Sequence, residues 1–164
     1  MLVFLDVDGT LLPFADRPGG RRSAPAAGGN PLLRRLDPAD GPRLRALRCE
    51  LVWATTWGTE ANEVIAPVLG LPALPVVDWP DDEPPAPAGV HWKTRGLVAW
   101  AAGRPFAWLD DEITDRDRAW IAACHPAPAL LQRVDPRRGL TPADLAACAR
   151  HRAAHDRSPP RAQA

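Results

Sequence analysis

Short apolar segments alternate with segments of helical pattern along most of the 164 residues. Residues 2–7 (LVFLDV) and 50–54 (ELVWA) are nearly continuous apolar runs, which is typical of strands buried on both faces. Further strands are expected at 74–77, 105–109 and 129–134. Strands that alternate with helices form an α/β fold, so we predict a three-layer parallel sheet of about five strands with helices on both faces.

The segments between the predicted strands have apolar residues at helical spacing. These helices are expected at 40–48, 58–69, 92–102, 115–124 and from Thr141 onward. Gly70 would end the second helix, while Thr141 and Pro142 suit the N-cap and first position of the last one. Right-handed crossovers then place the carboxyl ends of the strands on one edge, where such sheets bind ligands.

The connections and the tail have a different composition. Residues 13–31 are rich in Pro, Gly, Arg and Ala, and residues 78–90 are acidic and rich in Pro, so both are expected to be irregular. The length suits one core, so we expect a single domain over 1–155. Residues 156–164 are expected to be a disordered tail.

The net charge is zero, with 20 Lys and Arg against 20 Asp and Glu. Non-specific nucleic-acid binding requires a basic surplus, so it is not the expected role. The first apolar run stops at Asp6, too early for a signal-peptide core, and no run is long enough to cross a membrane. The three cysteines lie far apart and form no metal-type cluster. We therefore expect a cytoplasmic protein, and the Arg-, Ala- and Pro-rich composition suggests a bacterial one.

Lys93 is the only lysine among the 20 basic residues. Lysine carries a compact charge on a flexible stem, whereas arginine carries a broad planar fork. In a chain that otherwise uses arginine, this lysine suggests a position that a guanidinium group does not suit, although a lone lysine on a solvated face is the alternative.

Polar side chains follow several predicted strands. These groups are Asp6-Val7-Asp8-Gly9-Thr10 after the first strand, Thr55-Thr56 after the second and Asp110-Asp111 after the fourth, with Lys93 near the start of the preceding helix. Because parallel strands end at the same edge, we expect these groups to lie together. Taken singly, each has an ordinary explanation: a turn or calcium loop, residues at a strand end, and a helix cap.

The chemistry of this set points to phosphate. Oxygen ligands from clustered carboxylates suit Mg²⁺ better than zinc. A carboxylate such as Asp6 can attack phosphorus, and Asp8 can protonate the leaving oxygen and then deprotonate water. The Lys93 ammonium and the Thr55 hydroxyl can hold phosphoryl oxygens. Gly9 permits a sharp exit from the first strand.

The sequence resembles the haloacid dehalogenase (HAD) superfamily over about residues 1–135. Its four motifs match LVFLDVDGTLL at 2–12, ELVWATT at 50–56, HWKTRG at 91–96 and FAWLDDE at 106–112. The resemblance implies a Rossmann-like fold. The stretch VWATTW, with GTEAN and LGLP after it, is also similar to small bacterial members of the superfamily, including domains associated with RNA repair.

Carried over by position, the resemblance implies Asp6 as nucleophile and Asp8 as general acid and base. Thr55, Lys93 and Gly9 are assigned to phosphate binding. Mg²⁺ would be held by the Asp6 carboxylate, the Asp8 carbonyl and one of Asp110 and Asp111, with Asp111 favoured as the direct ligand. An acid at position 8 favours phosphatases over dehalogenases and ion pumps, with a phosphomutase as a minor possibility.

Many members carry a cap domain, but residues 13–39 and 78–91 do not suit one, so we expect no substantial cap and an open site.

Two further features could contact the substrate. The arginines of the loop Arg17–Arg22 could bind further phosphates or simply be solvated. Trp57 could contact substrate by stacking on a ring, or pack in the core.

The sequence therefore predicts a Mg²⁺-dependent phosphohydrolase that cleaves a phosphate monoester through an aspartyl-phosphate. Its partner would be a phosphorylated substrate, with no membrane. A phosphatase of nucleotide or RNA ends is a narrower version of this hypothesis. A catalytically silent binding module of the same fold is a competing hypothesis, and so is a phosphotransferase.

Overall fold

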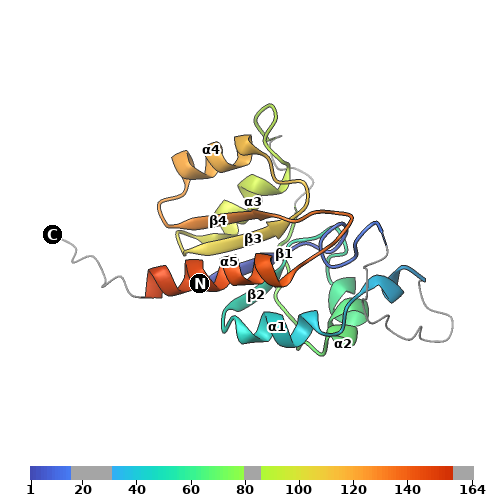
Figure 1. The fold of residues 1–164 in the computed structure, drawn as a ribbon. Coiled ribbons are helices and arrows are strands. Elements are labelled where there is room, and N and C mark those ends of the chain that lie inside the picture. Colours follow the sequence, from blue (N-terminus) through green and yellow to red (C-terminus); the bar gives the residue numbers. More distant parts are fainter. Residues whose placement is uncertain (16–30, 80–85, 157–164) are drawn as a thin grey trace.

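The computed structural model describes residues 1–15, 31–79 and 86–156. Within them, four parallel strands form one sheet in the order β2-β1-β3-β4. These strands are β1 (Leu2–Leu5), β2 (Glu50–Trp53), β3 (Phe106–Asp110) and β4 (Ala129–Arg133). Parallel neighbours require crossover connections, and the chain supplies them with helices on both faces of the sheet (Figure 1).

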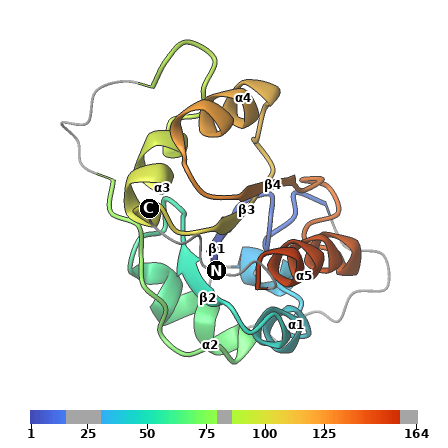
Figure 2. The same ribbon diagram turned by 90° about the vertical axis from the view of Figure 1, so that its left-hand side faces the viewer.

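The helices divide into two groups that sandwich the sheet. They are the 3₁₀ turn η1 (Pro31–Arg35), α1 (Asp40–Ala46), the π-helical turn η2 (Ala61–Ile65), α2 (Ala66–Leu69), α3 (Lys93–Ala101), α4 (Asp115–Cys124) and α5 (Pro142–Asp156). Helices α1, α2 and α5 pack on one face, and α3 and α4 pack on the other (Figure 2). The predicted three-layer α/β fold is confirmed.

The central strand β1 shows why its sequence is a continuous apolar run. Val3 and Leu5 face the core beneath α1, α2 and α5, while Leu2 and Phe4 face the core beneath α3 and α4. All four side chains are buried because the strand has a helical layer on each side.

The prediction of a strand at 74–77 is wrong. This segment makes only a single bridge, between Val76 and Trp53, so the described sheet has four strands rather than five. The amide of Trp53 donates to the carbonyl of Pro75, and Val77 donates to Trp53. Pro75 has no N–H to donate, and proline at this point prevents a longer ladder.

The helix expected at 58–69 is shorter and irregular. It begins as the π-helical turn η2 and continues as the single turn α2. Pro67 lacks the N–H that a regular helix would use here, which accounts for the change in winding. The predicted helix end is confirmed: Gly70 has φ 62°, in the left-handed region that glycine adopts at little cost.

Neither long connection forms a folded cap in the described residues, as expected. The loop Arg17–Arg22 and residues 157–164 lie outside the described residues, and Asp156 belongs to α5 rather than to a tail. The assignment of 1–155 to a single domain stays a prediction. Among the described residues, no helix has the length and apolar character needed to cross a membrane.

Asp117 joins α4 to the start of α3. Its carboxylate accepts hydrogen bonds from the amide and hydroxyl of Thr114, which completes a capping box at the start of α4. It also accepts from the His91 amide and the Thr94 hydroxyl, both at 2.7 Å. Burial favours the neutral acid, but these hydrogen bonds outweigh it and hold the pKa of Asp117 below its ordinary value of 3.8.

We predict that Asp117→Ala lowers the free energy of unfolding at neutral pH by about 3 kcal/mol, because buried donors lose a charged acceptor. Asp144 is the matched control. It forms a similar box with Thr141 at the start of α5, so Asp144→Ala should cost about 1–2 kcal/mol.

Urea unfolding of both variants provides the measurement. Because folding lowers the pKa of Asp117, its contribution is present above the ordinary value of 3.8 and is lost as the pH falls below it. The difference between Asp117→Ala and the unsubstituted protein should therefore shrink in acid. If the free energy of unfolding fell equally in the two variants, the result would contradict the role given to Asp117 at the start of α3.

Candidate active site

The register of the sheet brings the ends of three strands to one level. Leu5 of β1 pairs with Trp53 of β2 and with Leu109 of β3. Asp6 and Asp110 each follow the paired residue of their own strand, so they are neighbours at the carboxyl edge of the sheet. The Asp6 amide donates to the Leu109 carbonyl at 3.1 Å, which continues the ladder one residue past β1.

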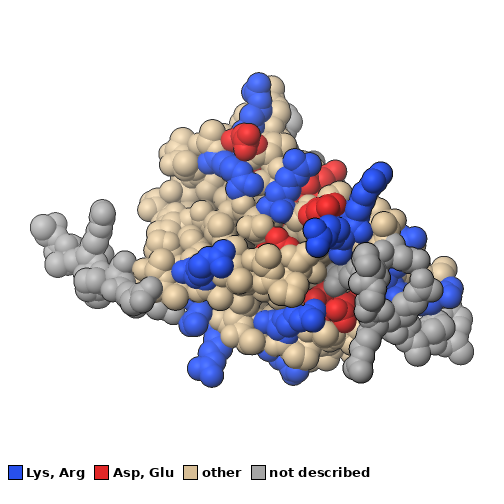
Figure 3. Space-filling model, viewed as in Figure 1, with Lys and Arg blue, Asp and Glu red and all other residues tan. Residues whose placement is uncertain are grey.

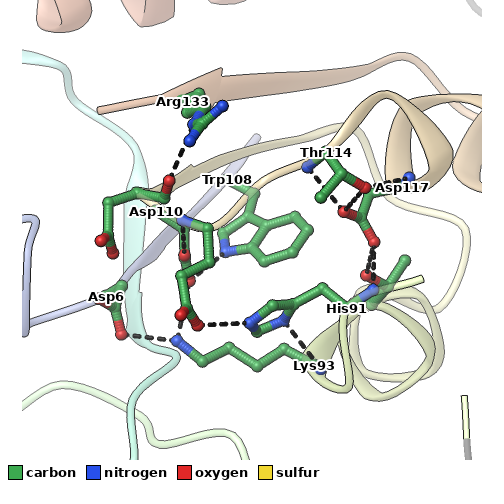
Figure 4. Close-up of polar contacts among 11 residues, drawn as sticks. Asp6, His91, Lys93, Trp108, Asp110, Thr114, Asp117 and Arg133 are labelled. Carbon is green, nitrogen blue, oxygen red and sulfur yellow. Dashed lines mark hydrogen bonds and ion pairs between the residues drawn. The ribbon is translucent and has the colours of Figure 1, made fainter. Parts of the chain in front are cut away.

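Lys93 lies between two buried carboxylates (Figure 4). Its Nζ is 2.6 Å from Asp6 Oδ1 and 2.8 Å from Asp110 Oδ2. Lys93 is the first residue of α3, so a single ammonium group ties this helix to both central strands. Lys93 is 87 residues from Asp6 and 17 residues from Asp110 along the chain.

Both carboxylate oxygens of Asp110 are occupied by donors from the protein. Oδ2 accepts from Lys93 and from the Trp108 indole Nε1 at 3.2 Å, and Oδ1 accepts from the Glu112 amide at 2.9 Å. Asp110 is therefore fixed by its neighbours and orients Lys93.

The carboxyl group of Asp111 lies against Gly9. A methyl group at Gly9 would come within 2.3–2.6 Å of the three carboxyl atoms of Asp111, so any other residue would displace that acid. Gly9 also has φ +73°, which favours glycine. On its other side, the Asp111 carbonyl accepts from Arg133 Nε at 3.0 Å. Gly9 is thus needed for the close approach of the loop after β1 to the end of β3.

Three carboxylates meet beside one ammonium group. Asp6, Asp110 and Asp111 each offer an oxygen within 4.8 Å of the others. Burial, partly offset by Lys93, raises the pKa of Asp6 to about 7. Burial and the charge of Asp110 raise the pKa of Asp111 to about 6. Burial opposes the charge of Lys93, but Asp6 and Asp110 outweigh it and raise the pKa of Lys93.

This charge balance fits a divalent cation. The cluster has more negative than positive charge, its ionised acids repel one another, and its donors are hard oxygen atoms. Among the described residues, Asp6, Asp110 and Asp111 each offer an oxygen to such a cation, and Asp110 also accepts hydrogen bonds from Lys93, Trp108 and Glu112.

Asp8 and Thr55 lie in a second group, joined by Trp57. The Trp57 indole Nε1 donates to Asp8 Oδ2 at 2.9 Å, and its backbone amide donates to Thr55 Oγ1 at 3.4 Å. The Thr55 carbonyl accepts from Trp79 Nε1 at 3.2 Å. The polar edge of the Trp57 ring is thus directed to the acid after β1. Its predicted stacking on substrate stays a prediction.

A sequence model described as the HAD domain in Swiss Army Knife RNA repair proteins matches residues 2–145. The chain belongs to this family. The resemblance to the HAD superfamily is therefore confirmed. No curated protein and no solved structure matches the chain.

Sequence reasoning missed several residues that support the HAD site. His91 Nδ1 accepts from the Lys93 amide at 3.2 Å, and His91 Nε2 is 3.0 Å from Glu112 Oε2. The spacing of Thr114 and Asp117 matches a capping box and could have been found from the sequence. The contacts of His91 have no such local pattern, because Glu112 lies 21 residues away.

We predict that Lys93→Arg destabilises the HAD domain by about 1–3 kcal/mol and abolishes any activity, because a planar guanidinium group overfills a site shaped for one nitrogen. The control exchanges the same two residue types at an exposed ion pair: Arg104→Lys, beside Glu50, should change stability by less than about 1 kcal/mol. Thermal unfolding of both variants provides the comparison. Equal stability of Lys93→Arg and the unsubstituted protein would contradict the tight fit.

Proposed function

We propose that this HAD domain is a Mg²⁺-dependent phosphatase that transfers the phosphoryl group of a monoester to Asp6 and then to water, in the cytoplasm. The observation that carries the proposal is the Asp6 carboxylate, 2.6 Å from the Lys93 ammonium, in a cluster whose charge calls for a further cation. Membership of the HAD family supports a hydrolase of the phosphatase type.

In the first step, an Asp6 oxygen attacks phosphorus and the bond to the leaving oxygen breaks. Asp8, as the neutral acid, gives its proton to that oxygen. In the second step, Asp8 takes a proton from water, the water oxygen bonds to phosphorus, and the bond to Asp6 breaks. Both carboxyl groups return to their starting states, and inorganic phosphate leaves.

The positive groups offset the repulsion between Asp6 and the phosphate. At about 4 Å and an effective dielectric constant of about 20, each pair of unit charges contributes about 4 kcal/mol. Lys93 can contact the phosphoryl oxygens from its place beside Asp6, and Thr55 is assigned to bind another of them. Mg²⁺, held by the carboxylates of Asp6 and Asp111 and the carbonyl of Asp8, would supply further neutralisation of the phosphate when bound.

Family membership also favours a nucleic-acid end as substrate, since the family is described from RNA repair proteins. Figure 3 shows basic side chains that are more frequent than acidic ones on the face it draws, but scattered over the described surface rather than gathered in one stripe. Together with the zero net charge, this supports recognition of a terminal phosphate at the site over recognition of a long duplex.

The decisive experiment is hydrolysis of an aryl phosphate by the full chain with Mg²⁺, with a chelator, and with Asp6→Asn. We expect turnover that requires Mg²⁺ and falls to background with Asp6→Asn. No turnover by a folded protein would instead favour a silent binding module. Transfer of the phosphoryl group to an acceptor other than water would identify a phosphotransferase.

The two acids after β3 should respond differently to substitution. Asp111→Asn is expected to raise the Mg²⁺ concentration needed for half-maximal activity by about tenfold or more, because a direct ligand loses its charge. Asp110→Asn should mainly lower kcat, because Lys93 loses one of its two anchors. Mg²⁺ titrations of activity for both variants check this, and the reverse pattern would exchange the two roles.

Trp57 should affect the rate of proton transfer from Asp8 to the leaving oxygen. Trp57→Phe keeps an aromatic ring but removes the donor to Asp8 Oδ2, so the acid loses the hydrogen bond that orients its carboxyl group. We expect kcat/KM to fall about tenfold for an alkyl phosphate, whose poor leaving group needs the acid, and less for a nitrophenyl phosphate.

The control for this measurement is Trp53→Phe. It removes an indole donor whose partner is Asn62, outside the site. It should lower stability and leave the ratio of the two kcat/KM values unchanged. If Trp57→Phe lowered kcat/KM equally for both substrates, the result would contradict a positioning role for Trp57.

A further inference from the structure

Trp92 is a large aromatic side chain left exposed beside the site. It is 45 % exposed, whereas Trp53 and Trp108 are fully buried in the core. Trp92 immediately precedes Lys93 in the chain, and the ammonium group of Lys93 contacts Asp6. Because nearly half of this side chain is exposed, a ligand bound at the site can contact its ring.

A second indole fixes the ring of Trp92. The rings of Trp92 and Trp79 meet edge to face, with centroids 4.9 Å apart and planes at 70°. Trp79 is itself anchored by its Nε1, which donates to the Thr55 carbonyl at 3.2 Å. The pair therefore joins the segment after β2 to the start of α3, the two segments assigned to phosphate binding, and presents a pre-organised aromatic surface.

The distance from this surface to the reacting group suits a nucleotide. The Trp92 ring centroid is 5.6 Å from Lys93 Nζ, and that nitrogen is 2.6 Å from Asp6 Oδ1. Added together, these distances put the ring within about 8 Å of an Asp6 oxygen. A base and a phosphate on the same sugar are separated by a similar length.

We propose that Trp92, supported by Trp79, stacks on the nucleobase of the nucleotide that carries the scissile phosphate. The proposal rests on the proposed phosphatase function and names its substrate class as a nucleoside monophosphate or the single-stranded end of an oligonucleotide. Stacking on an aromatic ring tolerates every base, because each base has a π-face. The site would therefore select for the presence of a base rather than for its identity.

The test compares a nucleoside 5′-monophosphate and a nucleoside 3′-monophosphate with ribose 5-phosphate, which has the sugar and phosphate but no base. Stacking contributes about 1–3 kcal/mol per base, so the unsubstituted chain should favour at least one nucleotide over ribose 5-phosphate by about 5–150-fold in kcat/KM. Trp92→Ala should remove most of this preference, and Trp92→Phe should restore part of it.

Trp100→Ala is the matched control. Trp100 lies on the same helix as Lys93 but packs on Phe4, in the core on that face of the sheet. Its loss should lower stability without changing the preference for a nucleotide. A preference that survives in Trp92→Ala, or that falls equally in Trp100→Ala, would overturn the proposal. So would faster turnover of a phosphotyrosine peptide that depends on Trp92, since it would assign the ring to a protein substrate.

Equilibrium binding to Asp6→Asn separates this proposal from the proposed function. The same pairs of ligands are compared by fluorescence or calorimetry, with no turnover required. If the unsubstituted chain hydrolyses nothing and Asp6→Asn still prefers nucleotides through Trp92, the phosphatase proposal fails and the stacking site stands. If ribose 5-phosphate is hydrolysed as well as every nucleotide and binds as tightly, the stacking proposal fails and the phosphatase stands.

Discussion

The ammonium group of Lys93 is the interaction on which the rest of the site depends. Two buried carboxylates at the ends of β1 and β3 would repel each other without it, and the first residue of α3 would lose its ion pairs to the central strands. The fit between two oxygens, at 2.6 and 2.8 Å, also explains why a chain that otherwise uses arginine has a lysine here. In the proposed phosphatase, the nitrogen that holds the site together would also contact the phosphate, so substrate binding would redistribute contacts that already exist.

Much of the fold follows from the sequence because β1 and β3 are buried on both faces. Leu2 to Leu5 and Phe106 to Leu109 are continuous apolar runs, as a two-sided core requires, and an acid directly follows each run. The predictions failed where proline altered an otherwise apolar segment. Pro75 reduced an expected strand to one bridge, and Pro67 changed the winding of an expected helix. Both errors concern hydrogen bonds that a count of apolar residues does not detect.

The site was predictable to the extent that its residues directly follow strands. Asp6 and Asp110 are adjacent because parallel strands in register end together, and this needs no knowledge of side-chain packing. The hydrogen bond from Trp57 to Asp8 joins residues that are 49 positions apart, and it depends on the position of one indole ring in the folded chain. The donors that hold Asp110 and the close approach of Gly9 to Asp111 likewise depend on packing in the folded chain.

The proposed mechanism requires that Asp6 becomes covalently phosphorylated. The most direct measurement is to quench the full chain in acid during turnover of a phosphate monoester with Mg²⁺, digest it, and locate any added phosphoryl group by mass spectrometry. We predict one phosphoryl group on Asp6, which is lost when the quenched protein is exposed to base, as expected for an acyl phosphate. Turnover with no phosphoryl group on Asp6, or with the group on another residue, would contradict it.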